Sequence, residues 1–173
     1  MSFSELAKKR YSVRKFKDEK VPEDIIKKIL YAGYIAPTGK NNQPQRILVI
    51  ESDEAVAKLK ECTRCHFDAP CAMLVCYNRD ECWYRPYDNA GSGEVDASIV
   101  TTHMMLEAAE LGIGTTWVMH FNPEKMRKAF SIPENIIPVS LLVMGYAADD
   151  AQPAPRHDEF RDESELVVYN EFK

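Results

Sequence analysis

The chain has 173 residues, of which 45% are hydrophobic and 28% charged, and this composition fits one domain with its own core and argues against wholesale disorder. The formal net charge is −5, from 22 Lys and Arg against 27 Asp and Glu, which argues against nucleic acid or an anionic membrane as the main partner. No apolar run approaches the ~20 residues that cross a bilayer, and the N-terminus lacks the features of a signal peptide, so we expect a cytoplasmic protein.

The N-terminal half is predicted to mix helices with short strands. Ser2 followed by Glu5 is the pattern of a capping box, which predicts a short helix at the very start of the chain. The predicted elements are a helix over 3–9, a helix over 22–36, a loop over 37–44, a strand over 47–50, a helix from Ser52 and a strand over 72–77.

The C-terminal half contains a helix with an unusual distribution of apolar residues. Residues 94–111 are apolar around most of the helical circumference, so this helix needs cover on nearly every side. A second subunit could supply part of that cover, and a fully buried central helix is the alternative. The other predicted elements are a surface loop or flap over 79–93, strands over 115–119 and 139–146, and a helix from Asn122 to Phe130.

The composition becomes polar after Ala147, yet residues 166–169 (Leu-Val-Val-Tyr) have the pattern of a strand. A polar linker that ends in a strand indicates exchange with a partner subunit. The elements do not alternate as βαβ units, so we predict an α+β fold, a central mostly antiparallel sheet flanked by helices. One domain would cover 1–173, with 147–173 as the arm. No G-x-G-x-x-G follows a strand, so a pyridine nucleotide would have to bind in another way.

The five cysteines include the spacing C-x-x-C-H at Cys62, Cys65 and His66, with Cys71 close behind. This spacing is found where haem is attached covalently, and the nearby thiols also suggest zinc. The odd number of cysteines and the absence of an export signal argue against disulfides and against haem. Zinc motifs normally have a second, separated pair of ligands. We favour the third interpretation, a helix end followed by a buried cysteine that enters a strand, and predict no metal site.

Two segments carry candidate chemistry. Residues 10–14 (Arg-Tyr-Ser-Val-Arg) place two guanidinium groups and a hydroxyl where a helix ends, a combination suited to phosphate, although a solvated basic turn has the same pattern. Residues 36–44 offer backbone and side-chain amides that suit one edge of a flat heterocycle, although an ordinary helix-to-strand connection would look similar.

Taken together and in order, these motifs resemble the nitroreductase family. The chain has R-x-S-x-R-x-F over 10–16, V-P over 21–22, A-P-T-G-K-N-x-Q-P over 36–44, and D-A-P over 68–70. L-G-I-G-T-T-W over 111–117, G-Y over 145–146 and P-R-H over 155–157 extend the resemblance over nearly the whole chain. It departs from the family in having Met119 and His120 where a glycine often stands, in having Gln45 after the Q-P pair, and in lacking the long helical insertion that covers larger members' active sites.

The resemblance implies a homodimer with FMN at the subunit interface, so that each site draws on both chains. By position, Arg10 and Ser12 resemble contacts of the phosphate and ribityl end, and Arg14 resembles the cation beside the flavin edge that gains negative charge on reduction. Met119 and His120 occupy the place where the family donates backbone groups to the central ring. The full set of implied cofactor-binding residues is Arg10, Tyr11, Ser12, Arg14, Pro37, Thr38, Gly39, Asn41, Gln43, Met119, His120 and Arg156. Of these, 37–39 would reach over from the partner, and Arg156 would close on the phosphate.

The implied function is an FMN-dependent oxidoreductase that passes electrons from NAD(P)H to a nitroaromatic, quinone or enone in alternating half-reactions. No catalytic side chain is certain, because the flavin carries the chemistry. His120 is either a proton donor or a backbone contact only, and we favour the second. Trp83, Tyr84 and Tyr87 would form either a substrate-stacking flap or a patch that covers the dimer. The competing functions are a flavin-binding sensor without efficient turnover and a c-type haem protein.

Overall fold

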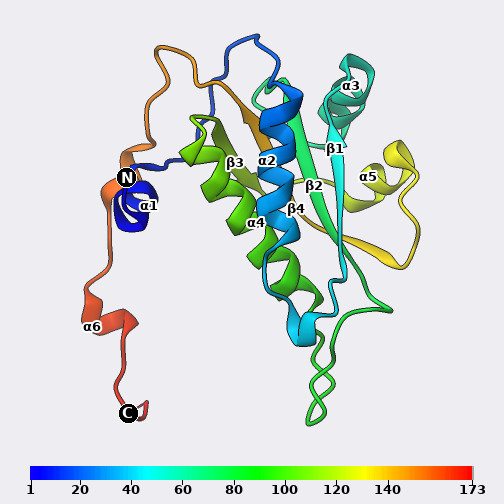
Figure 1. Cartoon of the computed structure of the whole chain (residues 1–173), viewed down its shortest axis with the longest axis vertical. Coiled ribbons are helices and arrows are strands. Elements are labelled where there is room, and N and C mark those ends of the chain that lie inside the picture. Colours follow the sequence, from blue (N-terminus) through cyan, green and yellow to red (C-terminus); the bar gives the residue numbers. More distant parts are fainter. Residues whose placement is uncertain (173) are drawn as a thin grey trace.

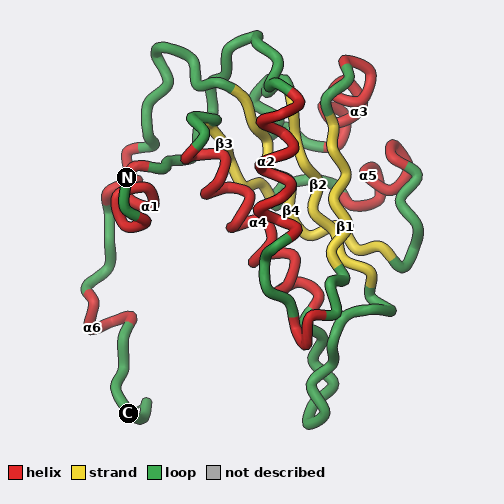
Figure 2. The backbone as a smooth tube through the Cα atoms, in the orientation of Figure 1, coloured by secondary structure: helices red, strands yellow, loops and turns green. Residues whose placement is uncertain are grey.

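The computed structural model describes residues 1–172 and has a four-stranded antiparallel sheet with helices on both faces (Figures 1 and 2). The strands, in the order β1-β2-β4-β3, are β1 (Gln45–Ile50), β2 (Cys71–Asn78), β3 (Gly114–Val118) and β4 (Ile136–Gly145). The helices are α1 (Phe3–Lys9), α2 (Glu23–Tyr34), α3 (Asp53–Cys62), α4 (Gly93–Glu110), α5 (Pro123–Phe130) and α6 (Glu163–Leu166), with 3₁₀ turns η1 (Gly39–Asn41) and η2 (Pro155–Asp158). The predicted α+β class is confirmed.

Side-chain caps fix where the helices begin. The predicted capping box is present, since the Ser2 amide donates to Glu5 Oε2 at 2.6 Å and the Glu5 amide donates to Ser2 Oγ at 3.3 Å. Ser52 caps α3 and Asn122 caps α5 in the same way, each accepting a backbone N–H of the first turn. These polar residues therefore set the helix starts as the sequence predicted.

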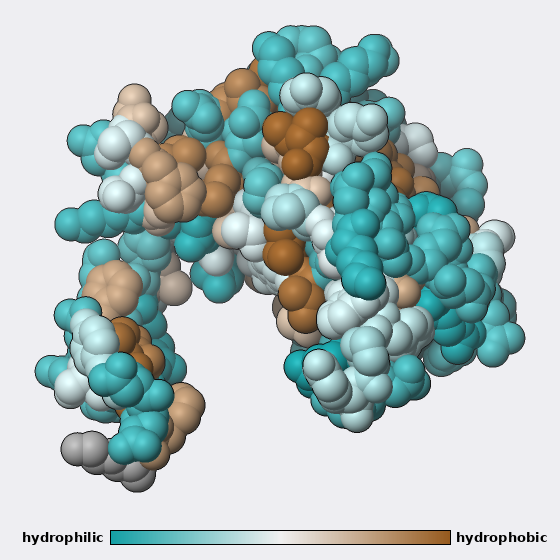
Figure 3. Space-filling view, turned by 60° about the horizontal axis from the view of Figure 1, so that its bottom comes forward, coloured by the Kyte–Doolittle hydropathy of each residue, from teal (hydrophilic) through white to brown (hydrophobic). Residues whose placement is uncertain are grey.

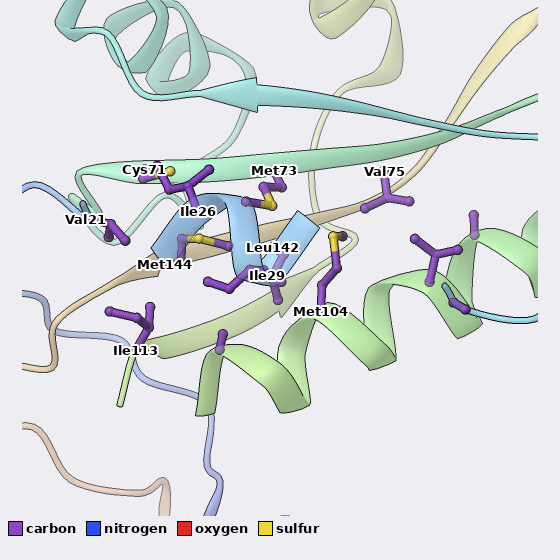
Figure 4. Packing of buried hydrophobic residues seen from close by; sticks show 14 residues of the cluster. Val21, Ile26, Ile29, Cys71, Met73, Val75, Met104, Ile113, Leu142 and Met144 are labelled. Carbon is purple, nitrogen blue, oxygen red and sulfur yellow. The ribbon is translucent and has the colours of Figure 1, made fainter. Parts of the chain in front are cut away.

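The sheet is buried on both faces, and the alternation of its side chains divides the core into two clusters. In β2, Met73 and Val75 pack toward α2 and α4 (Figure 4), whereas Leu74 and Cys76 pack toward α3 and α5. Strand β4 alternates in register with β2. The result is three layers, two helices on each side of the sheet.

Strand β4 is longer at its start than predicted. It begins at Ile136 rather than Val139, because the pairing register with β2 shifts between Val75 and Cys76. Val75 pairs with Ser140 and Cys76 pairs with Pro138, so the bulge admits a proline inside a central strand.

Helix α4 is not a fully buried central helix. Its inner side packs on the sheet and on α2, where Val100 and Met104 are buried. Its other side carries a stripe that lines a hollow of about 500 Å³ and is left uncovered by the chain, formed by Glu94, Val95, Ser98, Ile99, Thr102 and His103. The described chain therefore leaves this stripe exposed.

The prediction of a strand over residues 166–169 is wrong for the single chain. Leu166 is the last residue of the short helix α6, and no strand forms between α6 and residue 172. A strand needs a neighbour to bond its backbone, and the arm runs away from the sheet, as Figure 2 shows. Its side chains Leu166, Val167, Val168 and Tyr169 are exposed.

Candidate functional site

The basic segment over residues 10–14 lies along the outer edge of β3. Ser12 forms a parallel bridge with Thr115, and the Val13 amide donates to the Thr115 carbonyl at 2.9 Å. The Thr116 hydroxyl donates to the carbonyl of Val13. These bonds fix the segment as an irregular edge of the sheet, which holds its side chains in a defined place.

This segment provides unengaged cationic and hydroxyl groups suited to a phosphate. Within residues 1–172 the Arg10 guanidinium makes no ion pair or hydrogen bond, and the Arg14 guanidinium donates only to the Ser12 carbonyl, at 3.2 Å. Arg10 lines a cavity of about 270 Å³ together with Lys9 and Thr115, and the buried Thr115 Oγ1 has no hydrogen-bond partner in the described structure. Such a donor set fits the phosphate and hydroxyl chain of FMN.

Arg156 lies in η2, next to the same segment. The ring of His157 meets the ring of Tyr11 edge-on with centroids 6.3 Å apart, and Tyr11 Oη donates to the Ala151 carbonyl at 3.5 Å. Arg156 itself is exposed and pairs with Glu159 at 3.1 Å. The structure thus brings the start of the arm to the basic segment.

Met119 and His120 follow directly after β3. Both are exposed, and within residues 1–172 neither amide donates a hydrogen bond, whereas the His120 carbonyl accepts one from Thr63 Oγ1. Neither residue has a positive φ, so the turn forms without the glycine that often stands here in the family. The side chain of His120 points its Nδ1 toward Cys65 Sγ, 3.9 Å away. Two free N–H groups therefore remain for a ligand at this end of β3.

The loop over residues 37–43 folds on itself around η1. The Gln43 amide donates to Thr38 Oγ1 at 3.0 Å, and the Gln43 side chain donates to the Asn41 carbonyl at 3.3 Å. Lys40, Asn41 and Gln43 all have φ between 50° and 57°. A non-glycine residue is sterically strained in this left-handed conformation. Three such residues in one loop are typical of a functional site.

The two sequence motifs lie at opposite ends of α4 (Figure 1). The loop over 37–43 is bonded to the first turn of this helix through Gly39 and Asp96, and the cavity at Arg10 is lined by Gly112 and Gly114, just past its end. An 18-residue helix is about 27 Å long at ~1.5 Å per residue. Within one chain the two motifs are therefore too far apart to hold the same end of one small ligand.

Sequence reasoning missed Asp96, which is 2% exposed. Its carboxylate accepts the Gly39 amide at 2.8 Å and the Ser92 hydroxyl at 2.7 Å. Asp96 is one of four acidic residues on α4, with Glu94, Glu107 and Glu110, and no pattern in the sequence distinguished it from the other three.

The cysteines of the C-x-x-C-H pattern have structural contacts. Cys62 ends α3 and donates to the Lys58 carbonyl at 3.3 Å, and His66 Nδ1 accepts the Asp68 amide at 2.9 Å. Cys71 is the first residue of β2, and burial raises the pKa of its thiol to about 12. These positions match the third interpretation of the sequence, a helix end followed by a buried cysteine.

Within residues 1–172, no group of three or more His, Cys, Asp or Glu side chains is placed to hold a metal ion. No described helix has both the length and the apolar character to span a bilayer.

The comparisons with known proteins agree with the arrangement. The model of the nitroreductase family matches residues 7–72 and 63–146. A nitroreductase family protein from Clostridium difficile 630 is 44% identical with a TM-score of 0.94, over 99% of this chain and 100% of that chain. A protein from Methanothermobacter thermautotrophicus named as NADH dehydrogenase/NAD(P)H nitroreductase is 33% identical over 157 residues, 87% of this chain and 80% of its own length. A nitroreductase from Desulfovibrio desulfuricans, solved in complex with FMN, is 25% identical with a TM-score of 0.78, over 98% of this chain and 97% of that chain. The chain belongs to the nitroreductase family.

Proposed function

We propose that this protein is an FMN-dependent oxidoreductase that takes electrons from NAD(P)H and passes them to a small electron-poor acceptor, working as a homodimer. Relatives named for NAD(P)H and a family structure that contains FMN support the cofactors. One nitroreductase-like domain over 1–173, with 147–173 as an arm on the partner, is part of the same proposal.

The observation that carries the dimer is the separation of the two motifs along α4. Each flavin would be held at its phosphate end by residues 10–14 of one chain and approached by residues 37–39 of the other. The uncovered stripe on α4, the exposed Tyr31 and Tyr34 of α2, and the exposed Ile35 just after it would provide a face for the partner. Figure 3 shows apolar surface in brown on the body beside the recess and on the arm across it.

Different residues of each chain would bind different parts of the flavin. Arg10, Ser12 and the neighbouring Tyr11 would hold the phosphate and ribityl end, with Arg156 closing on it from η2. Arg14 would stabilise negative charge at the flavin edge. The free amides of Met119 and His120 would donate to the central ring, and the His120 side chain, turned toward Cys65, would have no part in proton transfer.

The partner's loop would complete the site. Pro37, Thr38 and Gly39 would lie over the flavin, and the bonds of Asn41 and Gln43 within the loop would hold its shape. Electron transfer is the chemistry that bound FMN would supply, hydride from NAD(P)H in one half-reaction and reduction of the acceptor in the next. Nitroaromatics, quinones and enones are the acceptors that suit this chemistry.

The absorption spectrum of the purified protein, before and after denaturation, tests the cofactor. Twin flavin bands with a chromophore released on denaturation are expected, followed by steady NAD(P)H oxidation when a quinone is added. Flavin without turnover would indicate a binding or sensing protein instead. A Soret band retained by the denatured chain would overturn the proposal in favour of covalent haem at Cys62 and Cys65.

A further inference from the structure

The flap over residues 79–92 is bonded to the loop over 37–43 at both of its legs. At the returning leg, Asp96 accepts the Gly39 amide and the Ser92 hydroxyl, and Ser92 Oγ accepts the Trp83 amide at 3.2 Å. Trp83 and Ser92 also bond through their backbones at 2.8 Å. One carboxylate thus links the loop to both sides of the flap's base.

The outgoing leg has its own bonds to the loop and to β1. The Asn42 side chain donates to the Glu81 carbonyl at 3.0 Å. The Glu81 carboxylate accepts from Arg46 on β1 at 2.6 Å and from Asn78 at 2.7 Å. Movement of the loop therefore requires movement of both legs of the flap.

The carboxylate of Asp96 is an unusual group to bury. It is 2% exposed and forms no ion pair within residues 1–172, and burying a charge without a partner is costly. Two donated hydrogen bonds and the positive end of the α4 dipole offset this cost. An apolar residue could fill this position without the cost of burying a charge. The bonds that the carboxylate makes to Gly39 and Ser92 therefore explain why an aspartate stands here.

We propose that Asp96 is a positioning residue that fixes the aromatic flap to the flavin-contacting loop, and that the flap thereby selects planar aromatic acceptors. This rests on the proposed function, in which residues 37–39 lie over the flavin. Since the flap is bonded to that loop at both legs, it stands at the rim of the same site.

The flap presents the side chains that such acceptors need. Tyr87 near its tip is 95% exposed, and Tyr84 packs beside Gly91 while its hydroxyl donates to the Arg79 carbonyl at 3.0 Å. The Cβ of Trp83 would lie 3.3 Å from a Cβ added at Gly39, so this residue is in direct contact with the loop. Aromatic rings at the rim favour flat ligands, because offset stacking adds to apolar burial.

Hydrogen exchange of the holoprotein tests the link without using activity. In Asp96→Asn the NH₂ group cannot accept the Ser92 hydroxyl and can only donate to Ser92 Oγ. The charge-assisted bonds to Gly39 and Ser92 are therefore replaced by weaker neutral ones. We expect exchange to rise by about tenfold or more in peptides from both the 37–43 loop and the flap, with β2 unchanged. Ser92→Ala removes the bonds of Ser92 Oγ to Asp96 and to the Trp83 amide, and it should act in the same direction. An increase confined to one of the two segments, or to neither, would overturn the inference.

Glu124→Gln is the matched control. It removes one negative charge from the first turn of another helix, α5, and the Glu124 side chain is exposed and makes no hydrogen bond or ion pair within residues 1–172. Its exchange should match that of the wild type.

Steady-state kinetics test the selection of acceptors. For Asp96→Asn and Ser92→Ala we expect the ratio of kcat/KM for the planar quinone menadione to kcat/KM for ferricyanide to fall by about tenfold, through a higher KM for menadione. Parallel losses with both acceptors, or no change in either, would contradict a selecting role. A wild-type protein that binds no FMN would overturn the proposed function instead, and the exchange data would still decide the link.

Discussion

Gly93, the first residue of α4, lies directly against the ring of Tyr77 near the end of β2. A Cβ added at Gly93 would stand 2.2 Å from the ring atoms Cδ2 and Cε2, closer than any side chain tolerates. The contact places the first turn of α4, which contains Asp96, against the end of β2. Glycine is required here for space, not for backbone freedom.

Gly93→Ala is therefore expected to destabilise the fold. Alanine has a higher helix propensity by about 1 kcal/mol, but displacing a packed ring costs roughly 1–3 kcal/mol, so the free energy of unfolding should fall. Urea denaturation measures the change. Tyr77→Leu should recover most of the loss in the double variant. An unchanged or raised stability of the single variant would show that the ring moves freely.

Arg14→Ala is expected to weaken FMN binding. The loss of a charge-assisted bond to the flavin should raise the dissociation constant by about ten- to a hundredfold, measured by titrating the apoprotein with FMN. Arg14→Lys keeps the charge but loses the planar guanidinium group, so its dissociation constant for FMN should lie between those of the wild type and Arg14→Ala. Lys20→Ala, which removes an exposed cation paired with Asp53, is the control. If Arg14→Ala and the wild type bind FMN with equal affinity, Arg14 is not part of the flavin site.

Ending the chain at Arg161 should weaken the dimer. This removes α6 and the exposed apolar side chains after it, each of which would contribute roughly 1.5–3 kcal/mol if fully buried on a partner. Sedimentation should show a dissociation constant raised by at least about a hundredfold, and FMN affinity should fall with it. Tyr169→Ala should give a smaller effect of the same sign. A truncated chain that dimerises like wild type would show that the arm packs elsewhere.

The buried thiols predict a fall in stability at alkaline pH. Burial raises the pKa of Cys71 and of Cys76 to about 12, while an unfolded thiol ionises at about 8.5. Between these values the unfolded chain binds fewer protons than the native state. The free energy of unfolding should therefore fall as pH rises through this window, by up to ~1.4 kcal/mol per pH unit for each thiol.

The measurement compares urea unfolding of wild type and of Cys71→Ala/Cys76→Ala at pH 8, 9 and 10 under reducing conditions. The double variant should lack this part of the slope, and Cys71→Ala alone should lack about half of it. The other groups that titrate at alkaline pH are the same in the wild type, the single variant and the double variant. Their contributions cancel when the pH dependence of the unfolding free energy is compared. Parallel curves for wild type and the double variant would show that neither thiol contributes.

Most of the fold was readable from local patterns. Caps at Ser2, Ser52 and Asn122 predicted three helix starts, because a polar side chain satisfies backbone N–H groups at a fixed spacing of two or three residues. The strands were found from short apolar runs. Their ends were less accurate, as the bulge at Pro138 shows, since a bulge depends on the partner strand and not on the segment itself.

The candidate site was predictable only in part. The ordered motifs at residues 10–14 and 36–44 indicated the family, and the model of that family matches most of the chain. The pattern at 166–169 predicted a strand, but the single chain provides no strand to pair with it. Nothing local marked Asp96 as the group that joins Gly39 to Ser92.

The sequence by itself determined the helix starts, the strands and the residue types that could bind a flavin, because caps, periodicity and motifs act over a few residues. Only the tertiary structure decided that the two motifs stand at opposite ends of α4, and that Asp96 bonds to a loop 57 residues away. These relations depend on how the helices pack across the sheet. Packing brings together residues whose separation in the chain carries no information about their distance in space.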